Sequence, residues 1–234
     1  MYLKIREILR RIFYIKIPQR AQGRQALSTL KARGIVIREV LVGESDKILT
    51  IFAKGLGKIS VRAKGAKNVK SKFLAGTQLF TYSDFVIYTK LKYYNLAQVQ
   101  IIESFYGLTK DYDKFYLGTD LLKLTERVIV ENLENDNILL LLLKALQVIC
   151  KEDINNSIVA RAFELKLLQL LGVAPQIEGI YVVGSDSLKV SDGVRTAMEY
   201  VFSQPINKNL FLFQLGTKEL EELGQVNKFF IEGI

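Results

Sequence analysis

Cations are concentrated in one short segment of the chain. Residues 54–72, KGLGKISVRAKGAKNVKSK, hold seven Lys and Arg side chains, and no Asp or Glu occurs between Asp46 and Asp84. Cations at this density neutralise phosphates and release counterions from a nucleic-acid backbone. Nearby rings that could stack on bases belong to Tyr82, Tyr88, Tyr93 and Tyr94. The pattern indicates a nucleic-acid surface; the alternative is a solvated basic face with half-buried tyrosines.

Catalytic chemistry has little to work with in this sequence. It contains no His and one cysteine, Cys150, so it lacks histidine-based triads, histidine metal ligands, an internal disulfide and a thiolate zinc cage. The carboxylates are scattered, which argues against a metal-dependent nuclease. We therefore expect a protein that is not an enzyme and that holds no cofactor or metal, and we expect Cys150 to be a small buried residue.

Two short motifs have simple structural readings. Gly55-Leu56-Gly57 lacks the spacing of a phosphate-binding loop and predicts a tight hairpin turn. Glu44-Ser45-Asp46 predicts a turn whose side chains bond the local backbone.

The elements that must position the cations are strands. Short segments rich in β-branched and aromatic residues occupy 34–42, 46–53, 57–64, 77–90 and 95–104, separated by turn sequences. In the third segment, alternation places Lys58, Arg62 and Lys64 on one face and Ile59, Val61 and Ala63 on the other. Five strands in so short a span suit a small closed barrel of the OB-fold type, with the cations outside.

From Asp111 the hydrophobic period becomes helical. We expect helices from about 112, over 136–151 with Asp136 as cap, and over 155–171 with Asn155 near the N-cap and Gly172 at the C-terminal end. A hairpin near 177–190 and two further helices follow. The leucine run 139–143 predicts a buried core, with a partner groove as the alternative. The fold class is therefore α+β.

The N-terminus differs from the rest. Residues 1–33 carry nine cations and one acid, residues 34–80 nine cations and three acids, and the remainder is net acidic. Residues 1–17 predict a short basic amphipathic helix and 19–33 a linker. This helix supports an alternative reading, a non-enzymatic scaffold protein at a membrane surface. The longest apolar run, 138–143, is too short to span a bilayer, so we expect no span.

Two segments resemble bacterial RecO recombination-mediator proteins. GIVIREVLVGESDKILTIFAKGLGKISVRAKGAKNVKSKF is similar to the family's N-terminal signature, and RAFELKLLQLLGVAP resembles its F-E-x-(K/R)-L-L-x-x-x-G-x-x-P segment. The resemblance covers about residues 32–215. It implies an OB-fold DNA-binding domain at 32–108 after an extension at 1–31, and an α-helical domain at 109–234 with a ribbon remnant at 176–190.

The resemblance also implies a function in recombinational DNA repair after DNA damage. Family members bind single- and double-stranded DNA, anneal strands, and help to load the recombinase onto DNA coated by single-strand-binding protein. RecR and the acidic, Phe-ended tail of single-strand-binding protein are the implied partners, and a cytoplasmic, nucleoid-associated location in a bacterium follows.

The sequence departs from the family at the zinc-ribbon position, at the N-terminus, and at the C-terminus, where relatives often continue the last helix after KFFIEGI. Many members carry a zinc ribbon beginning C-x-x-C-G after the G-x-x-P segment, whereas Ile180 and Val183 stand at the cysteine positions here. We therefore expect a degenerate, metal-free remnant held by packing. Residues 1–29 precede the usual family start, and we expect them to come from an upstream start codon.

The candidate site residues form two groups. For DNA binding we expect Arg38, Lys47, Lys54, Lys58, Arg62, Lys64, Lys67, Lys70 and Lys72 to contact phosphates and Tyr93 and Tyr94 to stack on bases. For the acidic tail of single-strand-binding protein we expect a helical pocket rimmed by Lys144, Arg161 and Lys166.

Overall fold

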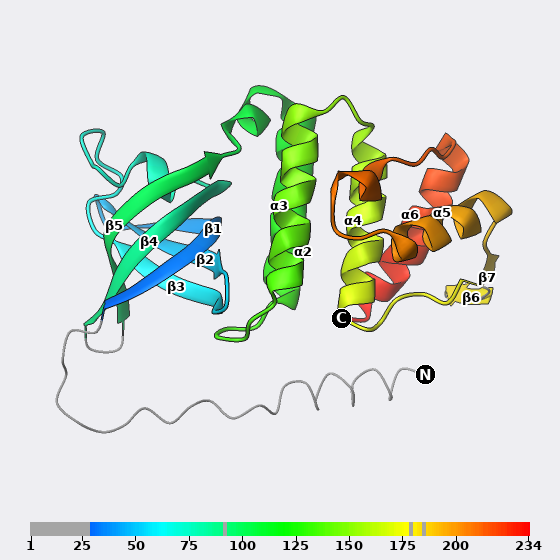
Figure 1. The fold of residues 1–234 in the computed structure, drawn as a ribbon, viewed down its shortest axis with the longest axis horizontal. Coiled ribbons are helices and arrows are strands. Elements are labelled where there is room, and N and C mark those ends of the chain that lie inside the picture. The colour runs from blue at the N-terminus through cyan, green and yellow to red at the C-terminus, as the bar shows by residue number, and fades with distance from the viewer. Residues whose placement is uncertain (1–28, 91–92, 178–179, 184–185) are drawn as a thin grey trace, which may run out of the picture.

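The computed structural model describes residues 29–90, 93–177, 180–183 and 186–234. The predicted helix at 1–17 lies outside the described residues, as does the upstream-start expectation. Where the chain is described, five strands come first and form a barrel at one end, and a mainly helical part with one short hairpin follows beside it (Figure 1). The fold is α+β, as the sequence predicts.

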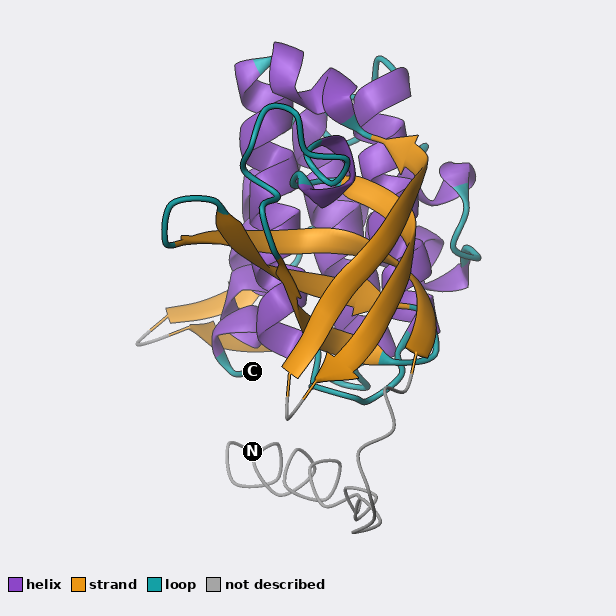
Figure 2. Cartoon of the chain, turned by 90° about the vertical axis from the view of Figure 1, so that its left-hand side faces the viewer, coloured by secondary structure: helices purple, strands orange, loops and turns teal. Residues whose placement is uncertain are grey.

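The strands close into a barrel in the order β1-β2-β3-β5-β4. Their bounds are β1 Thr29–Val42, β2 Asp46–Ala53, β3 Gly57–Ala63, β4 Thr81–Lys90 and β5 Tyr93–Ser104. All pairs are antiparallel except β3 with β5, which are parallel. This order and closure confirm the predicted five-stranded OB-type barrel, which Figure 2 shows from its outer side.

The first strand begins earlier than the sequence suggests. Residues 29–33 were expected in a linker, yet Thr29 pairs with Tyr88 and Arg33 with Asp84 across β4. The Arg33 guanidinium binds the Asp84 carboxylate through two hydrogen bonds of 2.7 and 2.9 Å. Local sequence does not show this strand, because the polar stretch is extended only through its pairing with a strand more than fifty residues away.

The helical part begins with the 3-10 turn η2 (Tyr106–Lys110) and α2 (Tyr112–Val128), which the Asp111 side chain caps by accepting the Lys114 N–H. Helices α3 (Asp136–Lys151) and α4 (Asn156–Leu170) follow, and Asn155 caps α4 as expected. Gly172 has a φ of +73° after α4, which fits its predicted terminal position.

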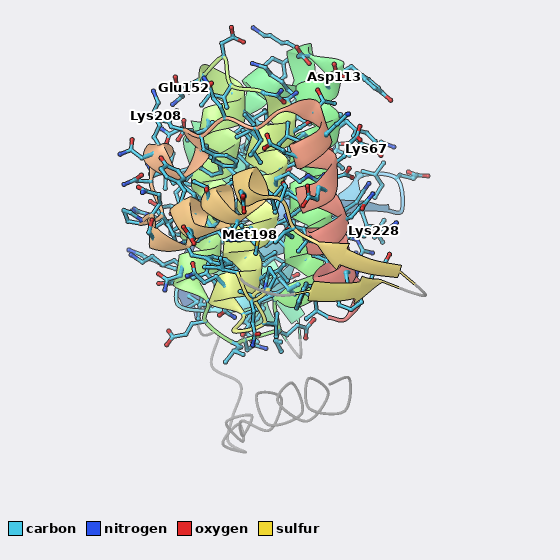
Figure 3. The ribbon with its side chains drawn as sticks, turned by 90° about the vertical axis from the view of Figure 1, so that its right-hand side faces the viewer. Lys67, Asp113, Glu152, Met198, Lys208 and Lys228 are labelled. Carbon is cyan, nitrogen blue, oxygen red and sulfur yellow. The ribbon has the colours of Figure 1, made fainter. Side chains whose placement is uncertain are left out.

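Beyond α4 the chain forms the hairpin β6 (Ile180–Val183) and β7 (Asp186–Lys189), then α5 (Asp192–Ser203), η3 (Lys208–Phe211) and α6 (Thr217–Glu232). The predicted hairpin at the ribbon position is thus confirmed. Lys208 of η3 pairs with Glu152 at the end of α3 at 2.8 Å, and Figure 3 shows the two side chains together.

Two clusters of buried side chains hold the molecule. One fills the barrel with residues such as Leu49, Ile51 and Val61. The other lies among the helices and also contains Ile35, Ile37 and Phe52 of the barrel. Most of the leucine run belongs to it, since Leu139, Leu141 and Leu142 are buried while Leu140 is 40% exposed. The core reading of that run is confirmed.

The turn between β2 and β3 is anchored on the helical part. Gly55 and Gly57 both have positive φ, as a tight turn requires. The Gly55 N–H donates to the Asp136 carboxylate at 2.8 Å, and a Cβ on Gly57 would collide with the Leu133 carbonyl group. Asp136 therefore binds the barrel turn, while our expectation that it caps α3 is wrong.

Candidate nucleic-acid interface

The outer face of β1, β2 and β3 carries the predicted cations. Ile59, Val61 and Ala63 are buried inside the barrel, so the residues that alternate with them point outward, as predicted. The register aligns two outward rows across the three strands: Val40, Ile48 and Arg62 form one, and Arg38, Thr50 and Ser60 form the next. The face is open over these two rows.

The residues that follow β3 form a basic loop, defined here as residues 64–74. Lys64, Lys67, Lys70 and Lys72 are all exposed on it. None of their ammonium groups pairs with a carboxylate among the residues that the structure describes. Lys72 lies over the Phe73 ring at 5.1 Å. The loop therefore presents four cations to solvent in a short span.

Asp46 fixes this loop to the β1–β2 turn. Its carboxylate accepts the Gly65 N–H at 2.9 Å and the Arg62 guanidinium at 2.8 Å, and the Lys67 N–H donates to the Ser45 carbonyl at 3.0 Å. The bond to Gly65, supported by Arg62, holds the pKa of Asp46 below its ordinary value. We expected the turn to bond its local backbone, but Asp46 binds a neighbouring loop.

Three further cations lie near the helical part. Lys54 is exposed at the β2–β3 turn. Lys58 donates to the Glu126 carbonyl at 3.1 Å, where it meets the negative end of the α2 dipole. Arg38 contacts the Glu126 carboxylate at 3.2 Å and stays mostly exposed. Arg38 and Lys58 therefore help to hold the barrel against α2. Their positive charges are partly balanced by Glu126 and by the end of the helix.

Lys47 does not belong to the outer face. It is 6% exposed, and its Nζ contacts Glu39 Oε2 at 2.7 Å. Lys47 shares the inward parity of Leu49, so the alternation of β2 carries it into the mouth of the barrel. An ammonium held there by a carboxylate is not available to a phosphate, and we remove Lys47 from the candidate set.

Of the two tyrosines expected to stack on bases, the structure describes the side chain of one. Tyr94 is half-buried and packs against the barrel core. Tyr93 begins β5, but its side chain lies outside what the structure describes. The face near Arg62 instead exposes Val40, Val42 and Ile48. The spacing of the cations does not point to these three residues, although they belong to the apolar runs of β1 and β2.

The three cations expected to rim a helical pocket are not together. Lys166 is 6% exposed and its Nζ donates to the carbonyls of Val201, Phe202 and Gln204, at 3.2, 3.4 and 2.7 Å. It thereby satisfies the C-terminal end of α5. Lys144 is half-buried and donates to Gln147. Lys166 therefore holds the end of α5, and the three cations do not surround one pocket.

Arg161 does line a groove. The groove measures about 740 Å³ and lies between α2 and the first half of α4, with Tyr116, Leu117 and Leu121 on the α2 wall. Arg161 pairs with Glu164 at 2.8 Å, and burial raises the pKa of Glu164. Because Asp113 and Asp120 also line the groove, its polar wall is mainly acidic.

Metal binding and membrane insertion are two further possibilities for the described part of the chain. Those residues contain no group of three or more His, Cys, Asp or Glu side chains that could hold a metal ion. None of the helices described there is long and apolar enough to cross a membrane. The clearest candidate site is thus the cationic face and loop of the barrel.

Comparison with known proteins gives a consistent result. Residues 27–105 match the family described as Recombination protein O N terminal, and residues 109–188 match Recombination protein O C terminal. The DNA repair protein RecO of Acetivibrio thermocellus is 33% identical over 231 residues, which cover 88% of this chain and 92% of that relative.

Two further relatives are also DNA repair proteins RecO. That of Alkaliphilus metalliredigens is 39% identical over 158 residues, covering 68% of this chain and 64% of the relative. That of Thermoanaerobacter sp. is 33% identical over 155 residues, covering 66% and 62%. The matched region thus spans slightly less than two thirds of these two relatives and nearly all of the first.

Proposed function

Because the chain belongs to the recombination protein O (RecO) family, we propose that it acts in recombinational DNA repair by binding DNA through its barrel. The observation that carries this proposal is the group of exposed ammonium groups on the basic loop, which have no carboxylate partner among the described residues. Exposed surface cations contribute little to the stability of a fold, whereas each contact with a phosphate releases counterions.

The proposed phosphate surface is smaller than the sequence suggested. Its centre is Lys64, Lys67, Lys70 and Lys72, with Arg62 beside them and Lys54, Arg38 and Lys58 at its helical end. If the four loop lysines each contact one phosphate, the slope of log K against log salt for single strands is about −3. A duplex would give a somewhat steeper slope for the same contacts.

The direct experiment is fluorescence anisotropy of a labelled 20-nucleotide single strand, and of its duplex, across a salt titration. Lys64→Glu with Lys67→Glu should weaken binding of both forms by about tenfold or more at low salt and make the salt slope shallower. Lys218→Glu with Lys228→Glu, two exposed lysines of α6, makes the same charge change elsewhere and should have little effect. Unchanged affinity after the loop substitutions would exclude the barrel surface.

Strand annealing and recombinase loading extend this proposal. A protein that holds phosphates without reading bases can bring two complementary strands together, because each strand keeps its base edges free. Annealing of complementary labelled oligonucleotides should therefore slow in the Lys64→Glu, Lys67→Glu variant. Loading should be measured as the recombinase activity recovered on DNA coated by single-strand-binding protein, with RecR added.

Partner binding forms the remaining part of the proposal. For the acidic tail of single-strand-binding protein we keep Arg161 of the α2–α4 groove as the candidate cation, with the neighbouring leucines as the site for a terminal Phe ring. Asp113, Asp120 and Glu164 oppose an acidic ligand there, so this binding requires Arg161 to leave Glu164 and pair with the tail. Arg161→Glu should weaken binding of a labelled tail peptide, whereas Arg127→Glu, an exposed residue of α2, should not. For RecR we expect co-elution of the two proteins at low salt.

A further inference from the structure

An aliphatic strip lies on the same outer face as the cations. Val40, Val42 and Ile48 are 40%, 36% and 37% exposed, and Val40 and Ile48 are direct cross-strand partners. All three are β-branched side chains standing on a twisted sheet, so their methyl groups form a stiff surface. Exposed aliphatic residues grouped on one face offer an apolar surface to a ligand.

The register places this strip beside positive charge. Ile48 pairs with Arg62 on β3, so the row of Val40 and Ile48 ends at a guanidinium. Val42 pairs with Asp46, whose carboxylate is engaged by Arg62 and by the Gly65 N–H. Asp46 is therefore compensated by a cation, while Glu44 of the adjoining turn is exposed.

The basic loop borders the same end of the strip. The Lys67 N–H donates to Ser45 in the turn that joins β1 to β2. Figure 3 shows Lys67 next to the pale blue end of this hairpin, which extends beyond the helices. An extended ligand that lies along the strip would therefore also meet the loop lysines, including Lys64 and Lys67.

The ligand that fits is an extended polyanion that exposes apolar planes. A single-stranded nucleic acid has both properties, because its bases are unpaired and each base has an apolar face. In a duplex the bases are stacked inside, and the phosphates alone would reach this surface. The exposed loop lysines at one end of the strip favour a polyanion over a neutral peptide.

We propose that Val40, Val42 and Ile48 contact the bases of a single strand while the basic loop holds phosphates of either form. This inference rests on the proposed DNA-binding function and deepens it. The strip then decides the preference for single strands over duplex, and it reads bases by apolar contact alone. Such contact favours the thymine methyl group slightly and otherwise tolerates all sequences.

The test uses a double variant of the full chain, which carries both Val40→Thr and Ile48→Thr. Its DNA affinity is compared with that of the unaltered protein. Threonine retains the β-branched shape and strand propensity, so the fold should persist, and circular dichroism verifies this. Affinity for a labelled 20-nucleotide single strand should fall about fivefold, from the apolar area lost. Affinity for the matching duplex and the salt slope of both should stay unchanged, since no cation is removed.

Ile101→Thr is the matched control, because Ile101 is also a β-branched strand residue and is 41% exposed, on β5. It should leave both affinities unchanged. Equal losses on single strand and duplex, or no loss on single strand, would overturn the role of the strip while leaving the phosphate surface intact. Failure of the unaltered protein to bind any DNA at low salt would overturn the proposed function and this inference together.

Discussion

Asp46 and Gly65 are 19 positions apart in the chain, and the carboxylate of the first accepts the backbone N–H of the second at 2.9 Å. Asp46 belongs to the G-E-S-D motif and Gly65 to the K-G-A-K motif of the sequence. This bond joins the two motifs, because one supplies the acceptor and the other the donor at the start of the basic loop. Gly65 has a φ of +65°, which directs the loop away from β3.

Asp46→Asn should loosen the basic loop. The neutral amide is a weaker acceptor for the Gly65 N–H and does not pair with the Arg62 guanidinium. Amide hydrogen exchange over residues 64–70 should become faster, while exchange in the helices stays unchanged. Asp84→Asn, which breaks the ion pair with Arg33 on another part of the barrel, is the control and should leave the loop unaffected.

Acid should reproduce the effect of that substitution. The pKa of Asp46 is lowered in the folded chain, chiefly by the Gly65 N–H and then by Arg62. Its stabilising contribution is therefore complete above its ordinary pKa near 3.8 and is lost as the pH falls through the lower folded value. Exchange over residues 64–70, corrected for its intrinsic pH dependence, should rise in that acidic range in the unaltered protein and not in Asp46→Asn.

Gly57→Ala should destabilise the protein strongly. A Cβ there would collide with the Leu133 backbone, and the φ of +67° is itself unfavourable for alanine. We expect a loss of more than about 2 kcal/mol in the free energy of unfolding. Gly43→Ala has a similar φ of +61° with nothing nearby, so it should cost about 1 kcal/mol. Urea titrations of the two variants give the comparison, and equal losses would contradict the contact with Leu133.

Lys47→Met should separate stability from DNA binding. The ammonium is buried against Glu39, so its removal leaves that carboxylate without its cation and should cost about 1–3 kcal/mol in unfolding free energy. DNA affinity at low salt should change less than twofold, in contrast to Lys67→Met on the loop. A large loss of affinity with Lys47→Met in folded protein would return Lys47 to the phosphate surface.

Lys166→Met should weaken the packing of α4 on the end of α5. The three carbonyls that receive the ammonium would lose their donor, at a cost of about 1–3 kcal/mol in unfolding free energy. Thermal or urea unfolding measures this loss. Lys144→Met, which removes a single bond to Gln147, should cost less.

The same variant carries a pH signature. Burial lowers the pKa of Lys166 in the folded chain from its ordinary 10.5, so between the two values the unfolded chain binds more protons. The unfolding free energy contributed by this residue therefore rises with pH across that range. The stability difference between the unaltered protein and Lys166→Met should grow as the pH approaches 10.5. A difference that shrinks instead would contradict the desolvation of Lys166.

Local patterns predicted the elements and long-range pairing decided the exceptions. Helix α3 occupies 136–151, as the periodicity predicted, because the residues of its apolar face all lie within about four consecutive turns of the chain. Residues 29–33 form a strand because they pair with β4. The Asp136 carboxylate accepts the Gly55 N–H of the barrel instead of capping α3. Such partners are far away in the sequence and leave no local signal.

The candidate site shows the same division. Alternation along β3 predicted the outward direction of Lys58, Arg62 and Lys64 from their own strand. The same alternation along β2 places Lys47 on the inward side, opposite Ala63 of β3. Lys47 was included among the phosphate-binding candidates because of its charge, without regard to which side of the strand it occupies. For Lys166, only the position of α5, set by the packing of another helix, makes its burial apparent.

The shared hydrophobic cluster has a consequence for cooperativity. Ile35, Ile37 and Phe52 of the barrel belong to the same buried cluster as the helices, so separation of the two parts would expose apolar surface on both. Heat should therefore melt strands and helices in a single calorimetric transition. A single transition would mean that the barrel is not an independent module on a hinge. DNA bound on its outer face, as proposed, would then keep a constant distance from the α2–α4 groove.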